Sequence, residues 1–258
     1  MSASLVDTHC HLGHIERPLE DVLRDAAAAG VETVIDIGMG TAESQMSARR
    51  AADRPGRVYA CVGIHPNDLE EFEADTEAAM ATLGELAGKP GVVGIGETGL
   101  DYHRDRSDRG LQERAFRAHI DLASRSDRTL VIHCREAHDR VLEVLDDAGP
   151  PERVVMHCFS GDVAFAKVCA ERGFFCSFAG NITYRRNDEL RKAARCLPPG
   201  LLLIETDAPF LAPDPHRGKP NHPGLLPHTA EVLASERSIS LSALAKSLGE
   251  NTRRAFAL

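Results

Sequence analysis

The sequence predicts an α/β protein folded as a single-domain (β/α)8 TIM barrel over residues 1–258, and three observations lead to this fold class. Short β-branched runs alternate with stretches rich in Ala, Leu, Glu and Arg along the whole chain. The β-branched runs are nearly continuously apolar, as expected for a parallel sheet that is covered on both faces. The length suits one such barrel, which commonly has about 250 residues. A doubly wound open sheet shows a similar alternation and is the rival architecture.

Eight strands are expected, one for each repeat of the pattern. They cover residues 5–9, 31–37, 58–64, 92–96, 129–133, 153–157, 174–178 and 201–205. Helical spacing lies between them, as over 19–29 and 111–123, and the tail 240–258 is expected to form a final amphipathic helix. Gly30 is placed to end the first of these helices, and Ser107 or Asp108 could cap the second.

Charge and cysteine usage narrow the class of protein. The formal net charge of −9 argues against long-range attraction to nucleic acid, but it leaves room for metal ions and a local basic rim to meet phosphates. The seven cysteines are odd in number and have no CxxC spacing, which favours buried thiols and a cytoplasmic location over a disulfide framework or a zinc finger. No membrane span is expected, because no apolar run approaches about 20 residues. No secretory signal is expected, because residues 1–5 have neither a basic region nor an apolar one.

Polar residues recur at the carboxyl ends of the predicted strands. They are His9, His65, Glu97, His133, His157 and Asp207. Barrel enzymes place their active sites at this face, and core histidines scattered by chance would not follow this register. The pattern therefore predicts that these side chains form one site.

The first strand carries two histidines with metal-ligand spacing. His9 and His11 are two residues apart, so both point to one side of a strand and can reach the same ion. An isolated HxH is often just one buried histidine and one solvated histidine. Asp207 follows the eighth strand, beside the first strand in a closed barrel, so it could join the pair and accept a proton from water. Glu205, two residues earlier, is expected to support a ligand.

A carboxylate and two further histidines complete the predicted site. Glu97 stands between glycines after an apolar strand, where a carboxylate could bridge two cations or merely cap a turn. His133 and His157 each end an apolar strand. Four histidines and two carboxylates suit a pair of borderline divalent ions better than an all-oxygen magnesium site. Two divalent ions are therefore predicted, of zinc, manganese or magnesium.

Seven motifs, in chain order, resemble one known family. They are DTHCHL, GIHP, GIGETGLD, IHCREA, HCFSG, ETDAP and HRGKPN. The sequence from Asp7 to the C-terminal helix resembles the TatD family of metal-dependent hydrolases and deoxyribonucleases. GIGETGLD and HCFSG are the specific motifs. The chain departs from many members in having His222 and Pro223 after RGKPN, where an acidic residue is usual.

The resemblance implies a TIM-barrel enzyme that cleaves phosphodiester bonds of nucleic acid, often as a 3′ to 5′ exonuclease on single-stranded DNA, with RNA as another substrate. It implies two metal sites and two residues that line the substrate pocket. The first site uses His9, His11, Glu97 and Asp207, the second uses Glu97, His133 and His157, and the pocket is lined by His65 and Asp101. Glu97 and Asp207 are the predicted catalytic residues, and the protein is expected to act as a monomer.

Basic and aromatic residues in the loops of the same face suggest how a strand of nucleic acid would be held. The basic ones are Arg104, Arg106, Arg109, Arg185, Arg186, His216, Arg217 and Lys219. Arg217 and Lys219 are the predicted phosphate contacts. Each cluster of basic residues taken alone could equally be part of a solvated loop, and it is their shared location that favours phosphate binding. Tyr102, Phe159 and Tyr184 could stack bases, with Phe159 equally suited to the core.

Two other functions fit parts of the pattern. The same metal-binding residues could cleave a small-molecule amide, ester or lactone, and a closed or less basic mouth would favour that activity. A non-enzymatic binding scaffold would be expected to have lost at least one ligand, and every ligand position is filled.

Overall fold

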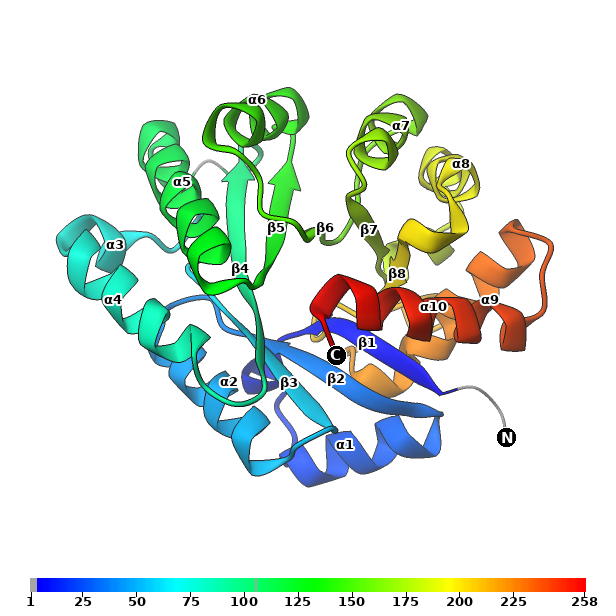
Figure 1. The fold of residues 1–258 in the computed structure, drawn as a ribbon. Helices are drawn as coiled ribbons and strands as arrows, with labels where there is room; N and C mark the ends of the chain where they lie inside the picture. The colour runs from blue at the N-terminus through cyan, green and yellow to red at the C-terminus, as the bar shows by residue number, and fades with distance from the viewer. Residues whose placement is uncertain (1–3, 105) are drawn as a thin grey trace. The chain divides into compact units, whose positions relative to one another are not determined.

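A computed structural model describes residues 4–104 and 106–258, and within them strands and helices alternate as predicted (Figure 1). The strands are β1 (Leu5–Cys10), β2 (Val31–Ile37), β3 (Val58–Val62), β4 (Val92–Asp101), β5 (Thr129–Arg135), β6 (Val154–Met156), β7 (Phe175–Phe178) and β8 (Leu202–Ile204). The α-helices are α1 (Leu19–Ala28), α2 (Thr41–Asp53), α3 (Glu70–Ala74), α4 (Thr76–Ala87), α5 (Arg109–Ser126), α6 (His138–Ala148), α7 (Val163–Glu171), α8 (Asp188–Cys196), α9 (Leu226–Glu236) and α10 (Leu241–Phe256). Four short 3-10 helices are η1 (Leu12–His14), η2 (Gly180–Thr183), η3 (Pro199–Leu201) and η4 (Pro223–Leu225).

The fourth strand is longer than the sequence predicted, and glycines explain why. The prediction ended this strand at residue 96, whereas β4 continues to Asp101. Gly96 and Gly99 have φ of +140° and +138°, which favours glycine. A Cβ at Gly96 would lie 2.4 Å from the Val131 carbonyl oxygen, and one at Gly99 would lie 2.1 Å from that of His133. The glycines therefore let β4 run close beside β5.

Helix ends follow the local signals in the sequence. The Asp108 side chain accepts a hydrogen bond of 3.0 Å from the Leu111 amide, so Asp108 caps α5. Ser240 caps α10 in the same way, and Gly30 follows α1 with φ +84°. These ends depend on residues within one turn of each other, which is why the sequence alone could place them.

Strand order distinguishes a barrel from an open sheet. The order is β1 through β8, the order of the chain. The last strand returns to the first, because Cys10 and Ala208 form a parallel bridge and the His11 amide donates to the Ala208 carbonyl over 2.8 Å. An open sheet would leave its terminal strands as two separate edges. The rival architecture is therefore excluded.

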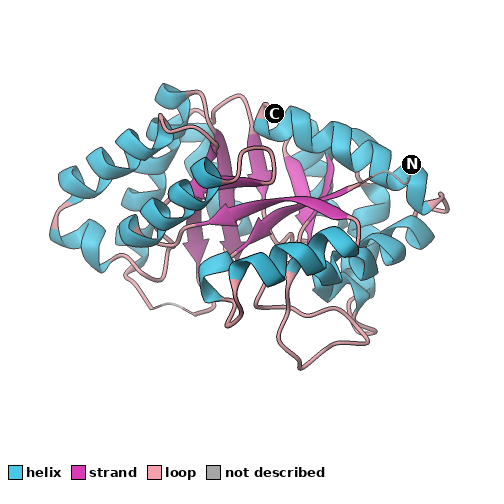
Figure 2. Cartoon of the chain, turned by 90° about the horizontal axis from the view of Figure 1, so that it is seen from below, coloured by secondary structure: helices cyan, strands magenta, loops and turns pink. Residues whose placement is uncertain are grey.

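Two compact units divide the chain, and each is described by itself. One comprises Met1–Ile35 with Cys158–Leu258, and the other comprises Asp36–His157. The prediction of a single domain stays a prediction. In the second unit β3, β4, β5 and β6 pair in parallel. Figure 2 draws the strands of the chain in magenta and its helices in cyan. The core of this unit includes Leu83, Ile95, Phe116 and Leu130, all fully buried.

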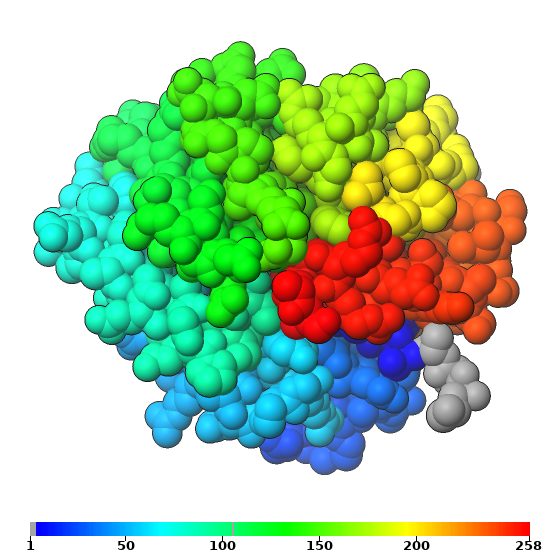
Figure 3. All heavy atoms as spheres, in the orientation of Figure 1, coloured from blue at the N-terminus to red at the C-terminus, as the bar shows by residue number. Residues whose placement is uncertain are grey.

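The C-terminal helix closes the first unit. Its Asn251 amide donates to the carbonyls of Pro199, at 2.7 Å, and Leu202, at 2.8 Å, which ties α10 to the start of β8. Leu244, Leu248 and Phe256 on the same helix are buried. In Figure 3 the red atoms of α10 lie beside the yellow atoms of the residues that precede β8. This helix therefore covers β8 at the end opposite to Asp207.

A buried histidine on α5 supports the backbone that leads into His65. The Nδ1–H of His119 donates to the Ala115 carbonyl at 2.7 Å, and its Nε2 accepts from the Ile64 amide at 3.1 Å. Burial lowers the pKa of His119 to about 4, because a charged ring would lose its hydration and Nε2 would no longer accept.

The free energy of unfolding is therefore expected to fall between pH 7 and pH 5 by about 2 kcal/mol through His119 alone. The folded pKa lies below the ordinary value of 6.5, so the unfolded chain binds the extra proton first and stability is lost as the pH falls. Urea unfolding at several pH values measures the slope. His119→Gln, which keeps an acceptor, should lose this part of the slope. An unchanged slope in that variant would contradict the assignment.

Most of the cysteines are buried thiols, as the sequence predicts. All seven cysteines are free thiols, and Cys10, Cys61, Cys134, Cys169 and Cys176 among them are buried. No helix in the described part of the chain is long and apolar enough to cross a membrane.

Candidate metal centre

The first unit brings together His9, His11 and Asp207, here called the β1–β8 cluster. His9 Nε2 lies 3.3 Å from His11 Nε2, and Asp207 Oδ1 lies 3.9 Å from the first nitrogen and 3.5 Å from the second. Ligand atoms at about 2.0–2.1 Å from a tetrahedral ion are separated by about 3.3 Å. The three donors thus have the spacing and the chemistry that a divalent ion requires.

A buried carboxylate connects the two strands that carry this cluster. Asp7 accepts hydrogen bonds from the amides of His9, at 3.3 Å, and Thr206, at 2.9 Å, and from the Thr206 hydroxyl at 2.5 Å. Burial raises the pKa of Asp7 to about 7, although the bonds from Thr206 oppose the shift. Asp7 therefore fixes the residues beside His9 and Asp207. Asp7 is not among the site residues predicted from the sequence, although its position two residues before His9 places both on one face of the strand.

The loop after β8 is held from its far end. Asn221 donates its side-chain amide to the carbonyls of Thr206, at 2.9 Å, and Phe210, at 2.6 Å. Asp207 lies between these two acceptors and has φ +54°, a left-handed conformation that aspartate tolerates better than most residues. The asparagine of the RGKPN motif thus holds the turn that presents Asp207.

The second unit gathers His65, Glu97, His133 and His157, here called the Glu97 cluster. Glu97 Oε1 lies 2.6 Å from His133 Nδ1, 2.9 Å from His157 Nε2 and 3.7 Å from His65 Nε2. Burial opposes ionisation, but the neighbouring His157 and His65 hold the pKa of Glu97 well below its ordinary value. A buried carboxylate ringed by imidazoles is a suitable anchor for a divalent ion, which would replace the positive charge of protonated histidines.

Asp101 lies behind His133 and is completely buried. Its Oδ1 accepts from the amides of His103, at 3.0 Å, and Arg104, at 2.8 Å. Its Oδ2 accepts from the Asn67 side chain at 2.9 Å and faces His133 Nε2 at 3.1 Å. Burial would raise the pKa of Asp101, yet the hydrogen bond from His133 and the others hold it below its ordinary value. Asp101 can therefore orient the His133 ring.

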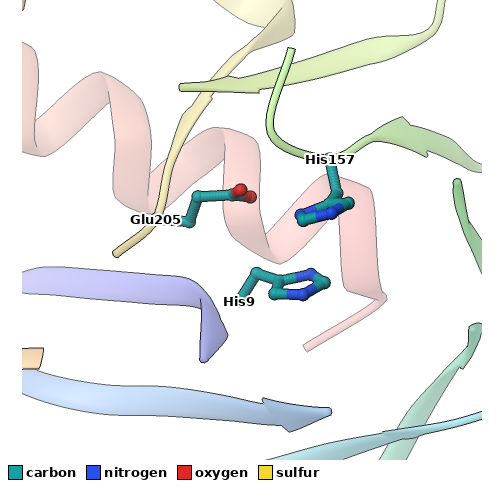
Figure 4. A group of neighbouring side chains, drawn as sticks. All are labelled: His9, His157 and Glu205. Carbon is teal, nitrogen blue, oxygen red and sulfur yellow. The ribbon is translucent and has the colours of Figure 1, made fainter. Parts of the chain in front are cut away.

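Glu205 also lies among possible ligands. Figure 4 draws its side chain, at the end of β8, with that of His9, which comes from β1 of the same unit. Within the first unit, Glu205 Oε1 accepts from the amide of Cys158 at 2.8 Å. Glu205 thus holds the backbone next to His157, and its predicted role in supporting a ligand stays a prediction.

The aromatic and basic loop residues separate into covered and exposed groups. Phe159 is buried against Phe165 and Phe178, so it belongs to the core. Tyr102 is covered by the Arg109 guanidinium at 4.2 Å, and Tyr184 by that of Arg217 at 4.4 Å. Further basic residues are exposed in the loops, namely Arg104, Arg106, Arg185, Arg186 and Lys219.

A parallel α/β fold with histidine and carboxylate clusters near the carboxyl ends of its strands is typical of the class of metal-dependent hydrolases. The model of the TatD-related DNase family matches residues 6–257. The chain belongs to this family, as the motifs indicated.

Relatives and a solved structure agree. The chain is 41% identical to a Mycobacterium tuberculosis protein named uncharacterized metal-dependent hydrolase TatD, over 98% of both chains. It is 36% identical to the Erwinia billingiae 3′-5′ ssDNA/RNA exonuclease TatD, over 93% of both. The crystal structure of a TatD homologue from Escherichia coli K12, YJJV, matches with a TM-score of 0.92 and 29% identity over 100% of both chains. The predicted (β/α)8 fold class is thereby confirmed.

Proposed function

We propose that this metal-dependent hydrolase cleaves phosphodiester bonds at the 3′ end of single-stranded DNA, and of RNA, as a monomer in the cytoplasm. The spacing of the β1–β8 cluster carries the proposal, because three donors 3.3 to 3.9 Å apart suit one divalent ion. The activity named for the Erwinia relative supports the choice of substrate, and the seven free thiols support the reducing compartment.

Two divalent ions are proposed, one for each cluster. His9, His11 and Asp207 would hold one, and Glu97, His133 and His157 would hold the other, with Glu97 as the predicted bridge. The imidazole-rich donor set favours zinc over manganese and magnesium, which prefer oxygen ligands. When bound, such ions supply a nucleophile from water near neutral pH and stabilise charge on the phosphate.

The protein's own groups supply the remaining roles. Asp207, which is 13% exposed, can accept a proton from the attacking water. His133 can bind an ion through Nδ1 while its Nε2–H donates to Asp101, an arrangement that orients metal ligands. The complete burial of Asp101 favours this role over the substrate contact that the family resemblance implies. His65 is left facing Glu97, at the edge of the same cluster.

The decisive experiment uses chelator-stripped protein supplied in turn with zinc, manganese and magnesium. Single strands labelled at the 5′ end should shorten progressively, whereas strands labelled at the 3′ end should release the label at once. Cleavage only after a metal is restored is expected. Failure with all three metals, together with hydrolysis of a lactone or amide panel, would favour the small-molecule alternative.

The predicted phosphate contacts, Arg217 and Lys219, are tested by salt dependence. Replacing both with alanine should lower kcat/KM on an oligonucleotide at low salt. The slope of its logarithm against the logarithm of salt concentration should flatten by up to about 1.4, because about 0.7 of slope is lost for each phosphate contact to a single strand. Lys246→Ala with Arg253→Ala, on α10, changes the charge equally and should leave the slope unchanged. Identical slopes in both double variants would show that Arg217 and Lys219 are only solvated surface charges.

A further inference from the structure

One phenylalanine departs from the burial of all the others. The chain has nine, and eight of them are at most 8% exposed, whereas Phe210 is 45% exposed. Phe210 lies in a turn whose backbone is fixed by hydrogen bonds. The Phe210 amide donates to the Asp207 carbonyl at 2.8 Å, and its carbonyl accepts from Asn221 at 2.6 Å. The backbone that carries this exposed ring is therefore held in place.

The position of this ring is specific. Phe210 meets the edge of His11 with 5.9 Å between ring centroids and 69° between their planes. His11 itself is only 2% exposed, whereas the phenyl ring that contacts it is 45% exposed. Among the aromatic residues of the loops, Tyr102 and Tyr184 each carry a guanidinium over one face. Phe210 thus offers an apolar, solvent-facing ring directly beside a candidate metal ligand.

We propose that Phe210 is the platform on which a nucleobase stacks when the phosphate beside it reaches the β1–β8 cluster. The proposal rests on the nuclease function above and adds a substrate-binding residue to it. Stacking on an aromatic ring suits an enzyme that processes any sequence, because every base offers a π face. It would also hold one nucleotide next to the cleaved bond by its base while the basic loop residues hold phosphates.

The test pairs removal of the ring with removal of the base. Single strands are compared with strands that lack the base at the terminal or at the penultimate 3′ nucleotide. Phe210→Ala should lower kcat/KM on the normal strand about tenfold, in line with the strength of base–aromatic stacking. On one of the two abasic strands the same variant should behave like the parent, because the partner of the ring is already missing. Phe210→Trp should restore cleavage of the normal strand.

Two controls separate stacking from damage to the metal centre. Ile239→Ala removes another exposed apolar side chain, 41% exposed, and should change nothing. The metal content of Phe210→Ala should equal that of the parent. An equal loss on normal and abasic strands would overturn the proposal and show that the ring positions His11. Unchanged cleavage of the normal strand would also overturn it. If the parent cleaves no strand with any metal, the proposed nuclease function itself is wrong. That result differs from the two above, in which the parent is active and only the role of Phe210 is contradicted.

Discussion

Glutamine in place of Glu97 is expected to lower kcat/KM on single-stranded DNA about a thousandfold and to reduce the bound metal. Glu97 Oε1 faces three imidazoles, those of His133, His157 and His65, at 2.6, 2.9 and 3.7 Å. A neutral amide would give an ion far less charge compensation. Loss of an ion removes several kcal/mol of transition-state stabilisation, and each 1.36 kcal/mol is tenfold in rate.

The loss should exceed that of the single-histidine variants His133→Gln and His157→Gln, because each histidine contributes one ligand atom whereas Glu97 faces them all. Elemental analysis of the metal content and steady-state kinetics give both readouts. Glu85→Gln, at an exposed position of α4, is the matched control and should behave like the parent. A Glu97→Gln variant that keeps two tightly bound ions and near-normal turnover would show that another group fills this role.

The second large effect is expected for Asp207→Asn. Asparagine has the same shape and also tolerates the left-handed backbone at φ +54°, so the fold of the turn should survive. Only the charge and the capacity to accept a proton are lost. We expect kcat to fall about a hundredfold to a thousandfold, the range typical when both an ion and a general base are weakened.

The measurement combines kcat with metal affinity by competition with a chelator. Affinity should fall for one ion and remain for the ion in the Glu97 cluster. Asp214→Asn is the control, because Asp214 is an exposed aspartate of the same loop. If both variants retain parental kcat, Asp207 neither binds an ion nor takes a proton.

The sequence by itself determined the alternation of strands and helices and the positions of the strand-end histidines. These features depend on neighbours a few residues away, such as the apolar run before His133 or the capping of α5 by Asp108. The shared register of the polar residues was visible for the same reason, since each follows an apolar run in the sequence. The family motifs added the activity that spacing alone left open.

Only the tertiary structure decided which groups support the ligands. Asp7 and Thr206 are 199 residues apart in sequence, and their hydrogen bonds exist because β8 returns beside β1. Similarly, β4 extends past Glu97 to Asp101 because its glycines fit against the β5 backbone, which no local pattern of β4 reveals. Phe210 is exposed because it lies in the turn that Asn221 holds. The residues around it, 208–213, are apolar and by composition would be expected in the core. Long-range pairing sets such contacts, so a short window of sequence cannot contain them.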